Sequence, residues 1–207
     1  MEMNMHLPQN VLAETELRHL AAIPYQMISP SANAPIIGIY QDSLLGSYRF
    51  TRPGVKLTPR DAMNLLMMCS HVNVDALLEN KNTLTSFDVL SQILSPITLK
   101  YKTKLFEENE DFETSNNVME IRNGKYIRGQ IEKSVLASTT KGVIHRIYND
   151  YGPMSSANFI DDLQNVVTEY MKTSSFSVGV SDLIANKKTQ DQITQVIQIG
   201  RAHVWTP

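Results

Sequence analysis

Apolar residues change their spacing twice along this chain of 207 residues, and that change constrains the fold more than any single motif does. Residues 159–170 repeat apolar side chains at helical spacing, whereas residues 97–101 alternate in the manner of a strand. Asn123-Gly124 separates two further strand-like runs, and such a pair between such runs is a strong hairpin signal. The pattern predicts an α+β fold of mixed helices and short antiparallel strands.

Several predicted helices have recognisable first turns. Asn10 can cap a helix that ends at Pro24, and Thr85 or Ser86 opens another that stops before Pro96. The run Thr58-Pro59-Arg60-Asp61 supplies a cap, a proline at the first helical position and an early acid for a helix through Met68. Residues 189–198 predict a last helix.

Other segments are shorter or ambiguous. Residues 36–40 predict a short buried strand, and residues 143–148 fit either a helix or a strand. Residues 107–113 are acidic and poorly apolar, which favours a solvated loop over a cation site. Residues 177–181 form a small-residue loop, and Asp161 and Asp162 are expected to face solvent.

Composition excludes several classes of protein. Lys plus Arg is 19 and Asp plus Glu is 21, which is not the basic balance of a free-standing nucleic-acid-binding domain. The single Cys69 excludes an internal disulfide framework. No apolar run is long enough to span a bilayer, and residues 1–12 lack the pattern of a signal peptide. These features predict an intracellular protein without a membrane partner.

A search for catalytic motifs finds little. The chain has neither a phosphate-cradling glycine-rich loop nor a GxSxG motif, and its histidines show no metal-ligand spacing. The sequence therefore predicts no catalytic residue and no metal ligand. Residues 100–104 (KYKTK) interleave lysines with an aromatic residue. They could touch a phosphate backbone or form the outward face of a strand.

The last nine residues, 199–207, fit no preceding period and hold the only Trp. They match, residue for residue, one reading frame of a common short-read sequencing adaptor in which TGA is read as Trp. We expect this segment to be an artefact, the alternative being a genuine basic tail.

Seven blocks, in order, resemble the largest subunit of multisubunit DNA-dependent RNA polymerases. The first resembles the segment just after that family's Asn-Ala-Asp-Phe-Asp-Gly-Asp loop, and the last resembles its Phe-Ser-x-Gly-x-x-Asp-x-Ile-Ala stretch. The resemblance spans residues 2 to about 198 and is weakest over 71–120. The blocks are EMNMHLPQ (2–9), MISP (27–30), PIIGI (35–39), QDSLLG (41–46), GQIEK (129–133), GVIH (142–145) and FSVGVSDLIA (176–185).

The resemblance implies an anatomy. Residues 1–45 resemble the end of the active-site domain, residues 46–158 the pore domain, and residues 159–198 the start of the funnel domain. In the family, Asp residues of the upstream loop hold the catalytic Mg²⁺, and a second Mg²⁺ arrives with the nucleotide. Met1 falls where the last of those Asp residues would stand. The Mg²⁺ ligands are therefore expected outside this chain, and the frame is expected to be truncated.

The resemblance also implies roles for individual residues. Glu2, Asn4 and His6 would contact and orient the metal-binding loop without binding the metal, or would only pack and hydrogen-bond. Gln41 and Asp42 would satisfy buried backbone groups near the active site, the alternative being a direct contact with substrate. Lys133 matches a basic position facing the pore, where it would meet nucleotide phosphate or RNA; its alternative is a salt bridge to Glu132 or Glu120. The family often has a second basic residue next, where this chain has Ser134.

The implied function is part of the catalytic subunit of a DNA-directed RNA polymerase, a nucleotidyltransferase used in transcription. The alternative is a non-catalytic assembly module on which other polymerase subunits and cleavage factors dock. The implied partners are the second-largest subunit, other polymerase subunits, template DNA, the RNA transcript and nucleoside triphosphates. Eukaryotic polymerase II-like, archaeal-like and large-DNA-virus enzymes share these blocks, so the compartment, nucleus or viral factory and virion, stays open.

Overall fold

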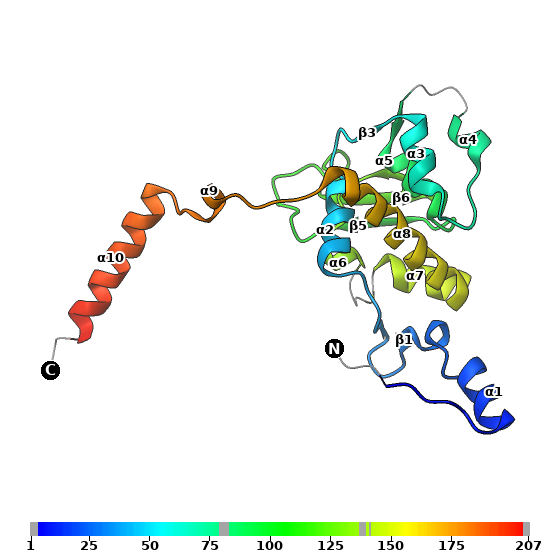
Figure 1. The fold of residues 1–207 in the computed structure, drawn as a ribbon. Coiled ribbons are helices and arrows are strands. Elements are labelled where there is room, and N and C mark those ends of the chain that lie inside the picture. The colour runs from blue at the N-terminus through cyan, green and yellow to red at the C-terminus, as the bar shows by residue number, and fades with distance from the viewer. Residues whose placement is uncertain (1–3, 79–82, 137–139, 141, 205–207) are drawn as a thin grey trace. The chain divides into compact units, whose positions relative to one another are not determined.

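The computed structural model describes residues 4–78, 83–136, 140 and 142–204, with the side chains of 76, 78 and 200–204 left undescribed. The chain divides into two units, Met1–Thr173 and Ser174–Pro207, and each is described by itself. Figure 1 shows helices and short strands mixed within the first unit. All described strand pairings are antiparallel, so the predicted α+β class is confirmed.

The centre of the first unit is a three-stranded sheet in the order β5-β6-β7. Its strands are β5 (Leu99–Lys102), β6 (Val118–Arg122) and β7 (Lys125–Arg128). The predicted hairpin is confirmed: Arg122 pairs with Lys125 across the turn. Asn123 and Gly124 have φ angles of 45° and 76°, the left-handed values that a two-residue type I′ turn requires.

One side of this sheet joins the main core. Helix α5 (Ser86–Ile93) lies along β7, and the Tyr126 amide donates to Ser91 Oγ at 2.9 Å. Helices α7 (Val143–Tyr151) and α8 (Pro153–Ser174) add further apolar side chains. The buried cluster that joins them includes Leu90, Met119, Ile121, Tyr126, Leu136, Val143, Phe159 and Leu163.

Helix beginnings follow the predicted caps. In α1 (Val11–His19) the Ala13 amide donates to Asn10 Oδ1 at 2.7 Å. Thr58 caps α3 (Pro59–Leu66), and Thr85 with Asp88 forms a capping box on α5. Helix ends come earlier than expected, since α1 stops at His19 before the 3-10 helix η1 (Ile23–Gln26), and α3 stops at Leu66.

The predicted strand at residues 36–40 is wrong. Strand β2 (Ala34–Pro35) pairs with β1 (Ile28–Ser29) and ends there. The following segment instead packs on the chain near Leu136: Ile39 donates its amide to the Leu136 carbonyl at 3.2 Å. A Cβ on Gly38 would lie 2.9 Å from that same oxygen, so the close approach needs a glycine.

The segment that fitted either a helix or a strand is the helix α7. It begins after Gly142, and Gly152, with φ of 87°, separates it from α8. Helix α2 (Gln41–Phe50) packs tightly on α8, because a Cβ on Gly46 would lie 2.3 Å from Val167 Cγ1. The remaining elements are β3 (Lys56–Leu57) paired with β4 (Leu84–Thr85), α4 (Val74–Leu78) and α6 (Lys133–Leu136).

The second unit contains α9 (Val180–Leu183) and α10 (Lys187–Val204). Helix α9 occupies part of the stretch that was predicted as a loop, with Gly179 and Asp182 forming its first turn. Helix α10 includes the predicted last helix and extends it at both ends. Ile193, Val196 and Ile197 recur on it at helical spacing and are exposed. Among the described helices, none has the length and apolar character needed to cross a membrane.

Candidate functional site

The candidate site is the segment that leaves β7, residues 129–133, together with the residues that fix it. Gly129 has φ of 102°, and a Cβ there would lie 2.3 Å from Met119 Cα. Both observations require glycine, because side chains rarely adopt this φ and β6 occupies the space. The pairing of β6 with β7 is irregular between Glu120 and Ile121, and Glu120 pairs with Arg128, the last residue of β7.

Thr51 anchors the same segment to α2. Its side chain is buried, and its Oγ1 accepts a hydrogen bond from the Ile131 amide at 2.9 Å. The same hydroxyl donates to the carbonyl of Ser47 at 2.9 Å. Thr51 therefore satisfies a buried backbone donor 80 residues away in the sequence and ties the end of α2 to residues 129–133.

Glu132 anchors the segment on its other side. Its Oε1 accepts the Lys104 amide at 2.6 Å and also the Ser134 hydroxyl. Ser134, Val135 and Leu136 are buried in α6, whereas Lys133 is exposed at the start of that helix. The chain thus presents a single cation, Lys133, on a segment whose backbone is held from two directions.

The alternative salt bridge of Lys133 does not form within the described part of the chain. Glu120 is buried and instead pairs with Arg128 at 3.0 Å and with Arg122. These hydrogen bonds, that of Arg128 first, hold the pKa of Glu120 below its usual value. Glu132 is engaged by the Lys104 amide and Ser134, as described above.

Arg128 also fixes the long loop between β5 and β6. Its guanidinium donates to the carbonyls of Ser115 at 3.0 Å and Phe112 at 2.9 Å. The predicted solvated loop at residues 107–113 lies here and contains no regular element. Two of its acids bind the chain itself, since Glu110 accepts from Asn117 and Asp111 accepts from the Glu113 amide and from Thr114. The Glu113 amide is the first of these causes that lower the pKa of Asp111.

The three lysines of the basic run at residues 100–104 have different surroundings. Lys100 forms an ion pair with Glu113 at 2.7 Å, and its ammonium lies 4.3 Å from the centre of the Phe112 ring. Lys102 lies 4.8 Å from the Phe106 ring and 5.1 Å from the Phe112 ring. Lys104 is exposed at the turn that follows β5.

The other residues expected near an active site belong to the N-terminal segment and to the start of α2. Glu2 lies outside the described residues, and Asn4 and His6 are exposed. Gln41 and Asp42 begin α2 and are exposed, and in the described part of the chain their side chains satisfy no buried backbone group. Asp42 lies at the opposite end of α2 from Thr51, about 13 Å along the helix.

The sequence did not indicate one pair of neighbouring titratable residues, Cys69 and Asp162. Asp162, expected to face solvent, is half-buried beside Cys69, and burial raises the pKa of its carboxyl. Burial, followed by the charge of Asp162, raises the pKa of the Cys69 thiol to about 11. Cys69 is therefore a thiol rather than a nucleophilic thiolate at neutral pH. Only the packing of α8 brings the two together, so the sequence carries no signal for them.

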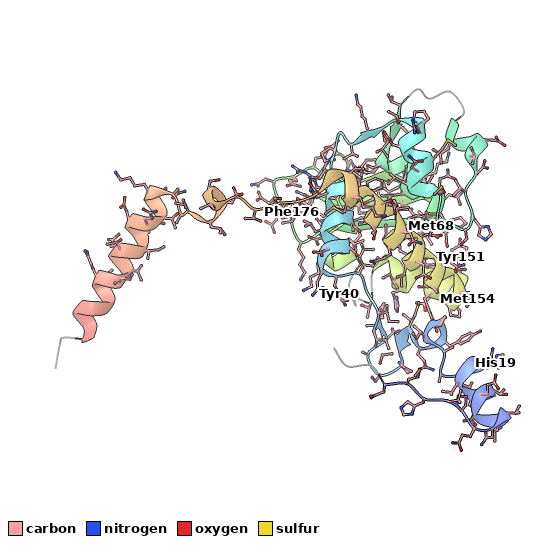
Figure 2. All side chains as sticks on the ribbon, viewed as in Figure 1. His19, Tyr40, Met68, Tyr151, Met154 and Phe176 are labelled. Carbon is pink, nitrogen blue, oxygen red and sulfur yellow. The ribbon has the colours of Figure 1, made fainter. Side chains whose placement is uncertain are left out.

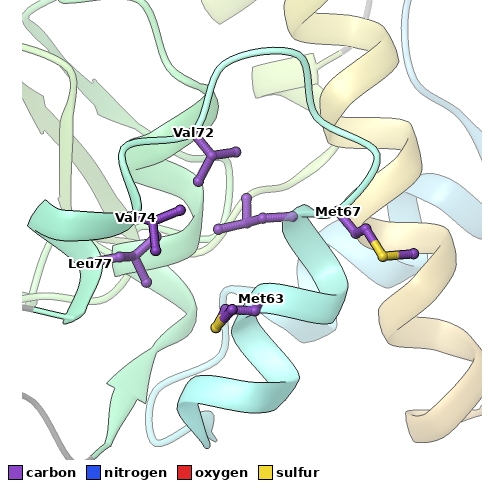
Figure 3. A pocket seen from close by; sticks show the side chains of 6 residues that line it. Met63, Met67, Val72, Val74 and Leu77 are labelled. Carbon is purple, nitrogen blue, oxygen red and sulfur yellow. The ribbon is translucent and has the colours of Figure 1, made fainter.

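The surface also carries an apolar groove that the sequence did not indicate. Figure 3 shows Met63 of α3 on one side and Val74 and Leu77 of α4 on the other, with Val72 on the loop between the two helices. Leu66 at the end of α3 and Met67 just after it also line the groove. The groove has a volume of about 140 Å³. Met68, which follows α3, is also exposed (Figure 2). Such a groove can hold an apolar side chain of another segment.

A metal centre has no support among the described residues, because they contain no group of three or more His, Cys, Asp or Glu side chains that could hold an ion. What the described residues provide is a rigidly held backbone segment with an exposed lysine. That arrangement can bind an anion by charge, and it offers no acid, base or nucleophile poised for bond cleavage.

Comparison with known proteins adds independent information. Residues 26–183 match the family described as RNA polymerase Rpb1, domain 3. The chain is 32% identical over 205 residues to the DNA-directed RNA polymerase II subunits RPB1-A and RPB1-B of Trypanosoma brucei brucei. It is 29% identical over 203 residues to the DNA-directed RNA polymerase subunit 1 of Acanthamoeba polyphaga mimivirus. These alignments cover 97–98% of this chain and 11–12% of the relatives' lengths.

Proposed function

Because the chain belongs to the RNA polymerase Rpb1, domain 3 family, we propose that it is part of the largest subunit of a DNA-directed RNA polymerase. In that subunit it would form the margin of the active site and the pore. The observation that carries the proposal is the family match over residues 26–183, which includes the anchored segment with Lys133. The relatives bear the names of such subunits, although this chain spans only about a ninth of their length.

We assign residues 1–45 to the end of the active-site domain, 46–158 to the pore domain and 159–198 to the start of the funnel domain. Residues 46–158 contain the sheet, α5 and α6, so the anchored segment is built within the proposed pore domain. Gly129, Thr51 and Glu132 give it a fixed backbone, which a wall beside moving RNA requires.

The proposed role of Lys133 is to bind phosphate in the pore. A lysine ammonium is a compact point charge that suits a phosphate group in several orientations. Lys133 is exposed and makes no ion pair with any residue that the structure describes. Its charge is therefore available to nucleotide phosphate or to RNA extruded through the pore.

Catalysis in the whole enzyme would use Mg²⁺ to stabilise the in-line displacement at the nucleotide. The described residues offer no group of ligands suited to that ion. Following the family resemblance, we propose that the Mg²⁺ ligands belong to the loop upstream of Glu2, and we assign residues 1–207 no catalytic residue. Glu2, Asn4, His6, Gln41 and Asp42 keep the proposed role of shaping the neighbourhood of the active site, without touching the metal.

The proposed partners are the second-largest subunit, other polymerase subunits, template DNA, the transcript and nucleoside triphosphates. The N-terminal part of the chain has the surface expected of a docked segment. Helix α1 buries none of its side chains, and Figure 2 shows its sticks, His19 among them, spread around the helix. Met5 and Leu7 are 97% and 88% exposed. The proposed setting is intracellular, either a nucleus or a viral factory and virion.

One observation favours a second function, an assembly module that docks other subunits or cleavage factors. The apolar groove between α3 and α4 would suit such a contact. Replacing Met67, which is 78% exposed, by lysine should then release a subunit or factor and leave RNA contacts unchanged. Intact assembly and factor binding in the Met67→Lys enzyme would contradict the assembly-module function, and only the catalytic-subunit function would remain.

The test of the main proposal uses a polymerase reconstituted around the full-length subunit. Lys133→Ala should alter backtracking or transcript cleavage, because a phosphate contact in the pore is lost, and should leave nucleotide selection unchanged. Lys125→Ala is a matched control, since Lys125 is also an exposed lysine, placed at the hairpin end of β7. Equal backtracking in the Lys133→Ala, Lys125→Ala and unmodified enzymes would contradict the proposed contact.

A further inference from the structure

A second cation lies near Lys133, and the structure shows which one. Of the three lysines at residues 100–104, Lys100 and Lys102 are engaged by Glu113 and by two aromatic rings. Lys104 differs from both. Its side chain is exposed, and it forms neither an ion pair nor a ring contact with any residue that the structure describes.

Glu132 is 28 residues from Lys104 in the sequence, but its hydrogen bond to Lys104 brings that lysine beside Lys133. The Lys104 amide lies 2.6 Å from Glu132 Oε1, and Lys133 is the next residue along the chain. A glutamate side chain, one peptide unit and the 2.6 Å hydrogen bond to the amide together span about 13 Å at most, so the two lysine backbones lie within about that distance. Two extended lysine side chains can therefore reach one phosphate or two neighbouring phosphates.

The Glu132 carboxylate lowers the net charge of the cluster but forms no ion pair with either lysine among the described residues. Glu132 Oε1 accepts the Lys104 amide and the Ser134 hydroxyl, so its hydrogen bonds go to the backbone and to a buried serine. Ser134 is 6% exposed and keeps its side chain inside. Within the described residues of the first turn of α6, Lys133 is thus the cation that faces outward, and Lys104 supplies the second charge from the turn after β5.

We propose that Lys104 and Lys133 form one two-lysine phosphate site, with the backbone of single-stranded RNA as its ligand. This inference rests on the proposed function, because it needs RNA to pass Lys133. Glu132 acts as the positioning residue, since it holds both lysine backbones by a single carboxylate oxygen and by sequence adjacency. Two lysine charges that contact the phosphates of single-stranded RNA give affinity for the RNA without preference for any base.

The experiment measures how salt affects the position of the RNA 3′ end in the reconstituted polymerase. A fluorescent base at the 3′ terminus reports the equilibrium between the paired and the extruded position over a potassium chloride series. Each phosphate contact on single-stranded RNA contributes about 0.7 to the slope of log K against log salt. Lys104→Gln and Lys133→Gln should each lower the slope by about 0.7, and the double variant by about 1.4.

Two further variants separate charge from structure. Lys104→Arg should restore the slope, because it keeps the charge and the backbone amide that Glu132 binds. Lys125→Gln should leave the slope unchanged, since Lys125 lies at the opposite end of the sheet from Lys102. A fall in slope with Lys104→Gln that Lys104→Arg does not reverse would mean a structural effect and would overturn the site.

The outcomes also distinguish this inference from the proposed function. If Lys133→Gln lowers the slope and Lys104→Gln does not, the pore contact stands and the two-lysine site is wrong. If neither variant changes the slope, the RNA contact of Lys133 and the two-lysine site are both wrong. A second arm measures KM for nucleoside triphosphate during extension. A change in KM with an unchanged salt slope would assign the lysines to the nucleotide triphosphate and overturn the RNA backbone as the ligand.

Discussion

Replacing Gly129 by alanine should strongly destabilise the first unit. The new Cβ would lie 2.3 Å from Met119 Cα, 2.6 Å from the Val118 carbonyl oxygen and 2.7 Å from the Met119 amide nitrogen. All three atoms belong to the backbone of β6, so relief requires the movement of a central strand. A non-glycine residue at φ of 102° adds about 1–3 kcal/mol of strain, and overpacking adds about 1–3 kcal/mol. The sum, about 2–6 kcal/mol, is a large part of the stability of an ordinary domain.

Gly54→Ala is the matched control. Gly54 has φ of 90°, and a Cβ there would meet no atom within 4 Å. Its substitution should therefore cost only the backbone strain, about 1–3 kcal/mol. Urea unfolding of the purified chain, followed by far-ultraviolet circular dichroism, compares the two variants. With a slope of about 1–3 kcal/mol per molar urea, the contact with β6 should lower the midpoint for Gly129→Ala by about 1 M relative to Gly54→Ala. Equal midpoints would refute the close packing of Gly129 on β6.

Four further predictions follow from particular contacts and residues. Thr51→Val should cost about 1–3 kcal/mol in urea unfolding and speed amide exchange at Ile131, because that buried donor loses its acceptor; unchanged exchange would contradict this. The fold lowers the pKa of Glu120 from its ordinary value of 4.5. Its contribution to stability should therefore be present above pH 4.5 and be lost as the pH falls through the lower pKa of the folded state. Glu120→Gln should flatten that acid limb in unfolding measured against pH. The purified chain should show no template-dependent primer extension and no tight site in a calorimetric Mg²⁺ titration, and either signal would mean that the catalytic centre is misplaced. Long-read sequencing of the source locus should lack codons for residues 199–207, and their presence in the genome would show that the tail is native.

Local signals predicted much of the fold. The turn at Asn123-Gly124 and the caps at Asn10, Thr58 and Thr85 depend on a few neighbouring residues, and the structure has each of them. The strand predicted at residues 36–40 was wrong for the opposite reason. The apolar run has the pattern of a buried strand, but the Ile39 amide donates to the distant Leu136 carbonyl instead of to a neighbouring strand. Helix ends were also misplaced, because packing rather than composition decides where a helix stops.

The candidate site was predictable only in part. Lys133 came from the family resemblance, and its exposure agrees with an anion contact. Lys104 lies in the basic run for which a phosphate contact was considered, but its proximity to Lys133 and the role of Thr51 could not be found from the sequence. Each depends on a hydrogen bond between residues 28 or 80 positions apart. The same holds for Cys69 and Asp162, whose altered pKa values arise from tertiary burial. Neighbouring residues in the sequence do not reveal such pairs.

The most direct measurement of the central claim is a cross-link from the RNA itself. A polymerase reconstituted around the full-length subunit is stalled with its RNA 3′ end extruded, and a 4-thiouridine at that end is activated by light. Mass spectrometry then identifies the linked peptide. If residues 129–136 border the path of the RNA, the cross-link falls on the peptide that contains Lys133. Cross-links confined to other peptides, with the RNA extruded, would contradict the account.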